Sequence, residues 1–171
     1  ANSAYNYDII ILDSNISTEN QNKIKNEFCS ERVSIRFYNV KSYLENRHLF
    51  VHRHFTVEIY YRLLMQDIMQ GYDKVVYLDS DLVVLDDISK LYGTNIGENY
   101  IAAVVDADFA GCYKGIDPDR KEYHEKFLKM NSPYHYFNSG VLIMNLTQFR
   151  KNITVKDIFD LAESKKWLFP D

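Results

Sequence analysis

Short apolar runs separated by helical and polar stretches organise this 171-residue chain. Several of these runs are rich in β-branched residues and predict buried strands, at 7–12, 74–78, 101–105 and 141–144. The segment 33–38 alternates apolar and polar residues and predicts a strand nearer a sheet edge. Continuous apolar runs are typical of parallel strands that are buried on both faces.

Helical patterns fill the segments between these strands. A polar stretch ending at Phe28 predicts a helix capped at Ser17 or Thr18, and a periodic apolar stripe predicts a helix over 56–69 that Gly71 ends. The remaining segments are expected to be helical within 86–91, 122–130 and 154–166, and to form a loop over 108–121. Strands alternating with helices favour an α/β fold with a mostly parallel sheet and helices on both faces.

The composition is that of a soluble globular protein, with 46% hydrophobic and 26% charged residues. A chain of this length fits one domain, which we expect to span residues 1–171. The formal net charge of −4 argues against a nucleic-acid-binding protein, which would carry a basic surface. No window approaches the roughly 18 apolar residues of a membrane span. Nothing in the sequence indicates the oligomeric state.

Two aspartates one residue apart, Asp79 and Asp81, directly follow the strand at 74–78. Residues i and i+2 of a strand share a face, so the two carboxylates would point the same way if the strand continued, or converge if it turned. In open α/β sheets, ligands bind at the carboxyl ends of strands. An Asp-x-Asp pair there suits a divalent cation, which in turn can hold a diphosphate. The alternative is that both acids face water or cap the following turn.

Four further residues are candidates for binding or catalysis. The guanidinium of Arg62 would bind phosphate oxygens bidentately, although a solvated helix charge is the simpler interpretation. His54 lies in a basic patch that would meet phosphate or acceptor hydroxyls, with a surface histidine as the alternative. Asn138 offers a donor and an acceptor to a sugar hydroxyl, unless it belongs to a simple turn. Asp106 ends its own strand and is therefore expected on the same rim as Asp79.

Three segments, in this order, resemble glycosyltransferase family 8: Arg62-Leu63-Leu64, then residues 72–81 (Tyr-Asp-Lys-Val-Val-Tyr-Leu-Asp-Ser-Asp), then residues 136–146 (Tyr-Phe-Asn-Ser-Gly-Val-Leu-Ile-Met-Asn-Leu). These retaining α-galactosyl- and α-glucosyltransferases include lipopolysaccharide enzymes and glycogenin. The resemblance runs from about residue 7 to the last residue. It implies a GT-A, or nucleotide-diphospho-sugar transferase, fold, a UDP-hexose donor, and Mn²⁺ or Mg²⁺ as cofactor.

The resemblance also implies how the donor diphosphate would be bound. Asp79 and Asp81 match the family's metal ligands, which bridge to the diphosphate, and Ser80 lies between them on the donor side. Arg62 matches a donor-binding arginine.

Further matches concern the sugars. Asn138 matches a residue that contacts the donor sugar, and Ser139 is its small neighbour. Asp106 matches a strand-end acid near the donor sugar and the acceptor. Asp171 matches an acid that lies against the reacting sugar and is the candidate nucleophile. His54 aligns with a position on the acceptor side.

Two features of the family have no counterpart in these residues. A first strand, whose acids hold the uridine, is missing before Ala1. A closing His-x-x-Gly-x-x-Lys-Pro-Trp segment, which supplies the third metal ligand and a phosphate-binding lysine, is missing after Asp171. We therefore expect the domain to be incomplete at both ends, and this chain to be nearly or wholly inactive while the parent protein is an active transferase.

The resemblance thus predicts metal-dependent, retaining transfer of galactose or glucose from a UDP-sugar to an acceptor hydroxyl of a cell-surface glycan such as lipopolysaccharide. A cytoplasmic location is expected, with the periphery of the inner membrane as the alternative for the whole protein. One rival function is a haloacid-dehalogenase-type phosphatase, because residues 75–84 also resemble the first motif of that class. Another is a sugar- or nucleotide-binding domain without turnover.

Overall fold

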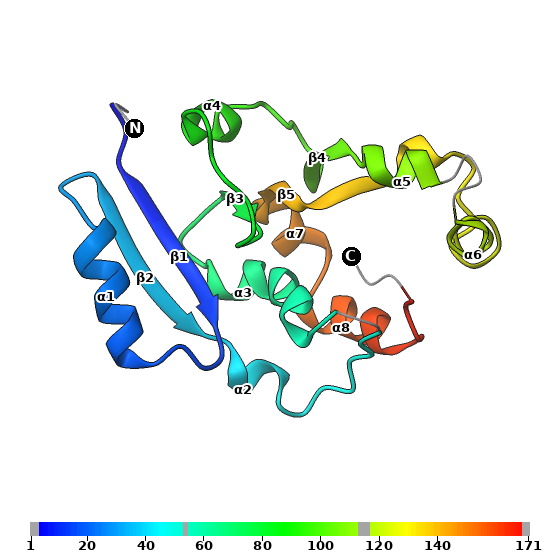
Figure 1. The fold of residues 1–171 in the computed structure, drawn as a ribbon, viewed down its shortest axis with the longest axis horizontal. Helices are drawn as coiled ribbons and strands as arrows, with labels where there is room; N and C mark the ends of the chain where they lie inside the picture. The colour runs from blue at the N-terminus through cyan, green and yellow to red at the C-terminus, as the bar shows by residue number, and fades with distance from the viewer. Residues whose placement is uncertain (1–3, 53–54, 113–116, 169–171) are drawn as a thin grey trace.

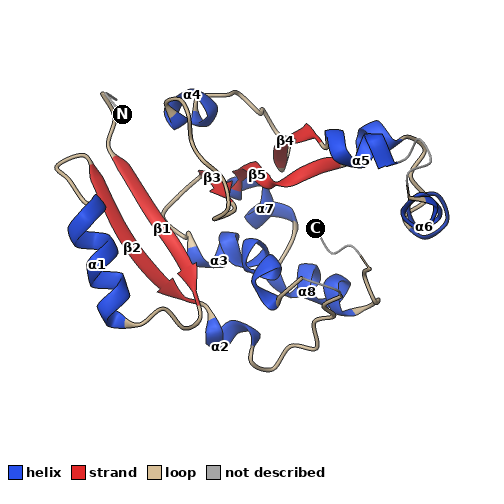
Figure 2. Cartoon of the chain, viewed as in Figure 1, coloured by secondary structure: helices blue, strands red, loops and turns tan. Residues whose placement is uncertain are grey.

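The computed structural model describes residues 4–52, 55–112 and 117–168. Within these residues the strands form two sheets, with the orders β1-β2 and β3-β5-β4, which lie side by side in Figure 1. Helices are distributed along the whole chain between and beside the strands (Figure 2). This mixture is the α/β class that the sequence predicts.

The first sheet is parallel and follows the predicted elements closely. Its elements are β1 (Tyr7–Asp13), the connecting helix α1 (Thr18–Phe28) and β2 (Val33–Asn39). Ser17 caps α1, because its side chain accepts the N–H of Asn20 at 3.3 Å. The helix is polar and has no buried residue, so it covers the sheet as a solvated layer.

The second sheet positions the candidate site. Its strands are β3 (Lys74–Leu78), β5 (Phe137–Asn145) and β4 (Ile101–Val105), and β5 runs antiparallel to both neighbours. Leu78 lies opposite Val141, and Val105 lies opposite Phe137. The carboxyl ends of β3 and β4 therefore both lie beside the first residues of β5, so the residues that follow them come together.

The direction of β5 differs from the expectation of a mostly parallel sheet. Of the strand pairs in the described residues, β1 with β2 is parallel, whereas β3 with β5 and β4 with β5 are antiparallel. An apolar run reports that a strand is buried on both faces, and parallel strands are only the commonest case of such burial. The run at 141–144 thus identified a strand without fixing its direction.

Two clusters of buried side chains meet at the helical segment in the centre of the chain. This segment begins as the 3₁₀-helix η1 (Val57–Leu64) and continues as α3 (Met65–Ile68), in place of the predicted α-helix over 56–69. Tyr60, Tyr61 and Leu64 of η1 pack with residues of α8 (Val155–Glu163). The second cluster consists of Met65, Met69, Leu142, Met144 and Leu146. The segment thereby joins α8 to strand β5.

In the segment 108–121 the described residues are mostly helical, whereas its glycines and proline predict a loop. It contains α5 (Ala107–Cys112) and α6 (Pro118–Glu122), followed by the π-helical turn η2 (Tyr123–Phe127) in place of the predicted helix 122–130. Pro118 occupies the first turn of α6, where a backbone N–H has no helical partner to lose. Asp117 caps the same helix by accepting the N–H of Arg120 at 3.1 Å.

Other helices complete the described residues. They are α2 (Lys41–Leu44), α4 (Ile88–Tyr92), the 3₁₀-helix η3 (Pro133–His135) and α7 (Leu146–Asn152), of which the sequence predicted α4. Helix α7 is capped by Asn145, whose side chain accepts the N–H of Gln148 at 3.1 Å. No helix among the described residues is both long and apolar enough to cross a lipid bilayer.

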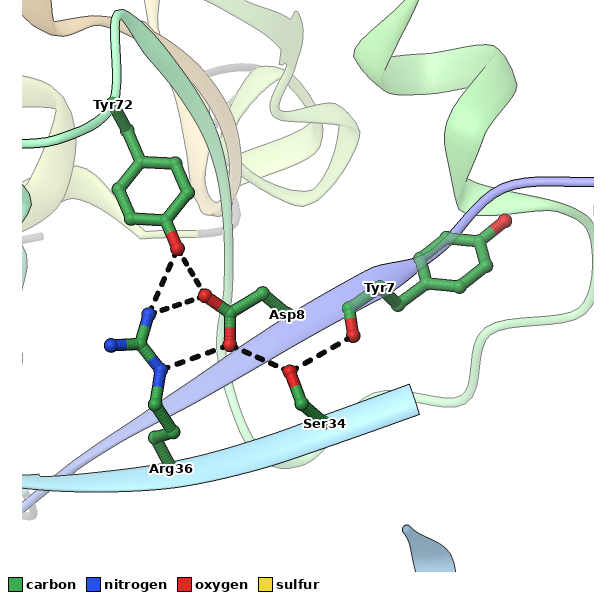
Figure 3. A network of polar contacts seen from close by, with 5 residues as sticks. All are labelled: Tyr7, Asp8, Ser34, Arg36 and Tyr72. Atoms are coloured by element: carbon green, nitrogen blue, oxygen red, sulfur yellow. Dashed lines mark hydrogen bonds and ion pairs between the residues drawn. The ribbon is translucent and has the colours of Figure 1, made fainter. Parts of the chain in front are cut away.

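A polar network ties the first sheet to the segment that enters β3 (Figure 3). Asp8 of β1 accepts hydrogen bonds from Ser34 and Arg36 of β2 and from the hydroxyl of Tyr72. The hydrogen bond and ion pair with Arg36 are the main reason that the pKa of Asp8 falls to about 2. The network therefore crosses from one sheet to the approach of the other.

Candidate active site

A cavity of about 380 Å³ opens where β3 and β4 end and β5 begins, a volume typical of small-molecule sites. The strand ends contribute Asp79, Asp81, Leu82, Asp106, Phe137, Asn138, Ser139, Gly140 and Val141 to its lining. The remaining lining comes from Phe55, from Asp108, Phe109, Arg120 and His124 of the region α5–α6–η2, and from Tyr136, which directly precedes β5. The cavity thus combines several carboxylates with one guanidinium and an aromatic wall.

Asp79 is held in place by two side chains. The hydroxyl of Tyr77 donates to Asp79 Oδ1 at 2.7 Å, and Nη2 of Arg62 lies 3.2 Å from the same oxygen. The backbone N–H of Asp79 donates to the carbonyl of Gly140 at 2.9 Å, which extends the β3–β5 pairing beyond the strand. The position of Asp79 is therefore fixed both by the hydrogen bond of its backbone N–H and by the two contacts of its carboxylate oxygen Oδ1.

Gly140 allows the close approach of Asp79 to β5. A Cβ atom built on Gly140 would lie 2.8 Å from Asp79 Oδ2 and 3.3 Å from Asn138 Oδ1. The first distance is shorter than real Cβ contacts, so a side chain at this position would force the Asp79 carboxylate to move, and glycine permits its present position. The N–H of Gly140 also donates to Asn138 Oδ1 at 3.0 Å, which leaves the amide NH₂ of Asn138 to face other groups.

The structure places Arg62 behind Asp79 rather than on the cavity surface. Arg62 is buried, with 8% of its surface exposed. The simpler interpretation, that Arg62 is a solvated charge on a helix, therefore does not apply. Nη1 donates to the carbonyl oxygen of Ser139 at 2.7 Å, and the guanidinium carbon lies 4.9 Å from the ring centre of Tyr77. Arg62 thereby connects the end of β3 to the start of β5.

Asp81 and Ser80 lie in the exposed turn after β3. Asp81 lines the cavity and forms no hydrogen bond or ion pair with any other residue that the structure describes. Ser80 is exposed and does not line the cavity. Of this pair, Asp81 is therefore the residue that lines the cavity together with Asp79.

Asp106 is brought to the same cavity by the end of β4. Its Oδ1 accepts the N–H of Phe109 at 2.8 Å and its own N–H donates to the carbonyl of Tyr136 at 3.0 Å. These bonds place the carboxylate at the start of α5, where a negative charge is favoured. The expectation that Asp79 and Asp106 share one rim therefore agrees with their position in the cavity.

The α5–α6 wall contains residues that the sequence did not identify. His124 is 1% exposed, its Nδ1 lies 2.7 Å from the carbonyl of Arg120, and its ring centre lies 3.9 Å from that of Phe109. Because a carbonyl accepts hydrogen bonds, Nδ1 carries the proton, and burial lowers the pKa of His124, which favours the neutral ring. No motif marked these residues: Phe109 and Arg120 come from the segment 108–121 that was predicted as a loop, and His124 comes from the predicted helix 122–130.

Two predicted site residues, His54 and Asp171, lie outside the residues that the structure describes. Within the described residues, no group of three or more His, Cys, Asp or Glu side chains is arranged to hold a metal ion. Asp79 Oδ2 and the carboxylate of Asp81 are hard oxygen donors at the edge of the cavity, the type that Mg²⁺ and Mn²⁺ prefer. These two residues fit part of a divalent cation site.

Comparisons with known proteins agree on one family. The family model described as glycosyl transferase family 8 matches residues 1–170. General stress protein A of Bacillus subtilis is 30% identical over 155 residues, which cover 88% of this chain and 49% of that protein. Lipopolysaccharide 1,2-glucosyltransferase of Escherichia coli is 31% identical over 120 residues, which cover 67% of this chain and 33% of that protein. The chain thus spans half the length of these relatives or less.

Solved structures show the same fold. The bifunctional glycosyltransferase WbbM in its apo form is 33% identical and superimposes with a TM-score of 0.82 over 96% of this chain and 30% of that chain. The galactosyltransferase LgtC, in complex with donor and acceptor sugar analogs, is 24% identical, with a TM-score of 0.68 over 91% of this chain and 53% of that chain. These neighbours confirm the GT-A fold that the sequence predicts.

Proposed function

This chain belongs to glycosyl transferase family 8, and we propose that the protein transfers a hexose from a UDP-sugar to a hydroxyl group of a glycan. The observation that supports this most directly is the cavity at the strand ends, in which Asp79 is fixed with one oxygen unbound by described residues and Asp81 stands beside it. The family match over residues 1–170 leaves the phosphatase alternative without support.

The donor diphosphate would lie at the edge formed by the end of β3. Asp79 and Asp81 would hold a divalent cation there, and Mn²⁺ and Mg²⁺ are the candidates that their oxygens suit. When bound, such a cation stabilises the negative charge that grows on the departing nucleoside diphosphate. Arg62 would act on the donor site through Asp79 and Ser139, because its guanidinium bonds to the carboxylate of the first and the carbonyl of the second.

The donor sugar would lie over the start of β5. There the backbone of Gly140 has no side chain to exclude the ligand, and the amide NH₂ of Asn138 can donate to a sugar hydroxyl. Ser139 is small and lines the same part of the cavity. Galactose and glucose differ at one hydroxyl, and both remain candidate sugars.

The acceptor would enter along the wall formed by α5 and α6. Asp106 lines the cavity between this wall and β3, and it is our candidate for the acid nearest the reacting groups. Asp171 and His54 keep their proposed roles at the donor sugar and on the acceptor side. A glycan of the cell surface is the proposed acceptor, in keeping with the lipopolysaccharide transferase among the relatives. The cytoplasm is the proposed location of the reaction.

Isothermal titration calorimetry of UDP binding tests this proposal. We expect the whole protein, of which this chain represents part, to bind UDP in the presence of Mn²⁺ and to lose this binding when EDTA is added. Asp79→Asn and Asp81→Asn should each weaken binding by more than the roughly 10–100-fold that loss of an outer-sphere partner costs. Asp119→Asn, which changes an exposed acid away from the cavity, should bind as the unmodified protein does.

Three outcomes of this experiment are distinct. Absence of UDP binding at any Mn²⁺ concentration would contradict the UDP-sugar donor. Binding that EDTA does not weaken would contradict the role of the cation. UDP binding in the titration, with no consumption of UDP-galactose or UDP-glucose in a separate turnover assay, would instead support the alternative of a binding domain without turnover.

A further inference from the structure

The two carboxylate oxygens of Asp79 have different surroundings. Oδ1 accepts the hydroxyl of Tyr77 at 2.7 Å and lies 3.2 Å from Nη2 of Arg62. Oδ2 lies 2.8 Å from the position that a Cβ on Gly140 would occupy, and it accepts no hydrogen bond from the part of the chain that the structure describes. An ionised carboxylate with one saturated oxygen can offer a ligand from the other.

Tyr77 is well placed to fix this asymmetry. It precedes Asp79 by two residues, so both side chains leave the end of β3 on the same face. Its ring also packs against the guanidinium of Arg62, with 4.9 Å between the guanidinium carbon and the ring centre. The three side chains therefore constrain one another, and the hydroxyl of Tyr77 has a defined direction.

We propose that Tyr77 is a positioning residue that, together with Arg62, occupies Oδ1 of Asp79 and leaves Oδ2 as the single oxygen that Asp79 presents to a divalent cation. This inference rests on the proposed function in one respect, namely that Asp79 is a ligand. It assigns a role to Tyr77, a residue that contacts the proposed ligand Asp79 and not the cation itself. Outer-sphere partners of this kind typically change metal affinity by about 10–100-fold.

Mn²⁺ binding, followed by the electron paramagnetic resonance signal of the free ion, tests the proposal without any turnover. In Tyr77→Phe the ring remains beside Arg62, but the donor to Oδ1 is removed. We expect the Kd for Mn²⁺ to rise by about tenfold, because Asp79 can then rotate and lose its single-oxygen geometry. Tyr72→Phe removes the equivalent hydroxyl from Asp8 and should leave this Kd unchanged.

A Kd for Mn²⁺ in Tyr77→Phe equal to that of the unmodified protein would overturn the proposal. If the unmodified protein binds Mn²⁺ and Asp79→Asn does not, such a result would remove the role of Tyr77 alone and leave the proposed function intact. If the unmodified protein binds no Mn²⁺, Asp79 is not a ligand and both proposals fail.

A second measurement does not depend on the folding of Tyr77→Phe. Infrared difference spectra of the unmodified protein with and without Mn²⁺ report the separation between the two carboxylate stretching bands, which is wide for binding through one oxygen and narrow for binding through two. We expect a wide separation for the bands that disappear in Asp79→Asn. A narrow separation would show that both oxygens bind and would overturn the proposal.

Discussion

Two groups in this protein contain the same three residue types in different surroundings. In the first, Asp8 contacts Arg36 and Tyr72 at the edge of the β1–β2 sheet (Figure 3). In the second, Asp79 contacts Arg62 and Tyr77 at the end of β3. Since the chemistry of the side chains is identical, the differences between the groups must come from how the backbone presents them.

In the first group, both carboxylate oxygens of Asp8 accept hydrogen bonds. Oδ1 of Asp8 accepts from Ser34 Oγ at 2.9 Å and from Arg36 Nε at 3.0 Å, while Oδ2 accepts from Arg36 Nη2 and from the hydroxyl of Tyr72. A carboxylate with donors on both oxygens has no strong site left for a ligand. This group is therefore a tie between secondary-structure elements, and its exposure keeps its contribution to stability small.

The second group leaves one oxygen without a donor and buries its arginine. The side chain of Arg62 is 10% exposed, compared with 57% for Arg36. Gly140 leaves room beside Asp79 Oδ2, where a Cβ would lie 2.8 Å from this oxygen and displace it. The comparison shows that a cluster of Asp, Arg and Tyr becomes a candidate binding site when its donors do not satisfy all of its acceptors.

The largest expected difference between the two groups lies in the stability that each arginine provides. Arg62→Met should lower the free energy of unfolding by about 2–3 kcal/mol, because it removes charged hydrogen bonds from Asp79 and from the carbonyl of Ser139 in a buried place. Arg36→Met should cost less than about 1 kcal/mol, as is usual for exposed pairs. Urea unfolding of the two variants and of the unmodified protein measures both values.

Methionine keeps most of the aliphatic volume of arginine, so the comparison isolates the guanidinium. Equal losses of stability in the two variants would contradict the distinction between a buried and an exposed group. A larger loss in Arg36→Met would reverse it.

A smaller effect is expected from filling the space beside Asp79 Oδ2. Gly140→Ala places a methyl group 2.8 Å from the present position of that oxygen, so Asp79 must move against its bonds to Tyr77 and Arg62. We expect the Kd for Mn²⁺ to rise about tenfold, as for other changes to the surroundings of a ligand. Free-ion paramagnetic resonance measures this Kd.

Gly71→Ala is the matched control, because a Cβ at Gly71 would meet nothing within 4 Å and no positive φ is recorded there. It should leave the Kd for Mn²⁺ unchanged and alter stability by less than about 1 kcal/mol. Unchanged Mn²⁺ binding in Gly140→Ala would show that Asp79 Oδ2 is not the oxygen that matters.

The sequence predicted the strands that carry the candidate site more reliably than their arrangement. The runs ending in Asp79 and Asp106 form β3 and β4 as expected, since an apolar run bounded by acids depends on local residues alone. The antiparallel direction of β5 depends on where the chain goes between 106 and 136, and an apolar run carries no information about that path. The register of β5 then determines that both acids reach one cavity.

Contacts between distant residues were the hardest to anticipate. The pairing of Arg62 with Asp79 joins two residues 17 apart, and nothing in the local pattern distinguishes Arg62 from a surface charge. Tyr77 could have been found, because its i, i+2 relation to Asp79 on a strand places both on one face. The wall formed by α5 and α6 was missed because the turn-forming residues of 108–121 also act as helix caps.

The smallest expected effect concerns the pH dependence of the first group. The pKa of Asp8 is lowered from 3.8 to about 2 in the folded protein, mainly by its bond to Arg36. A carboxylate with a lowered folded pKa stabilises the fold above its unfolded pKa, and this stabilisation is lost as the pH falls from about 4 to about 2. Because Arg36 is 57% exposed, solvent screening should limit the contribution to about 1 kcal/mol.

Urea unfolding at pH 5 and at pH 2 measures this contribution as a difference between variants. Asp8→Asn removes the titrating group, so its stability should fall by about 1 kcal/mol less over this interval than that of the unmodified protein. Introduced into Arg36→Met, the same substitution should have little effect on the pH dependence, because the main cause of the lowered pKa is already gone. If Asp8→Asn changed the acid dependence equally in both backgrounds, Arg36 would not be the partner that matters. The first group would then owe its order to Tyr72 and Ser34, which also donate to Asp8.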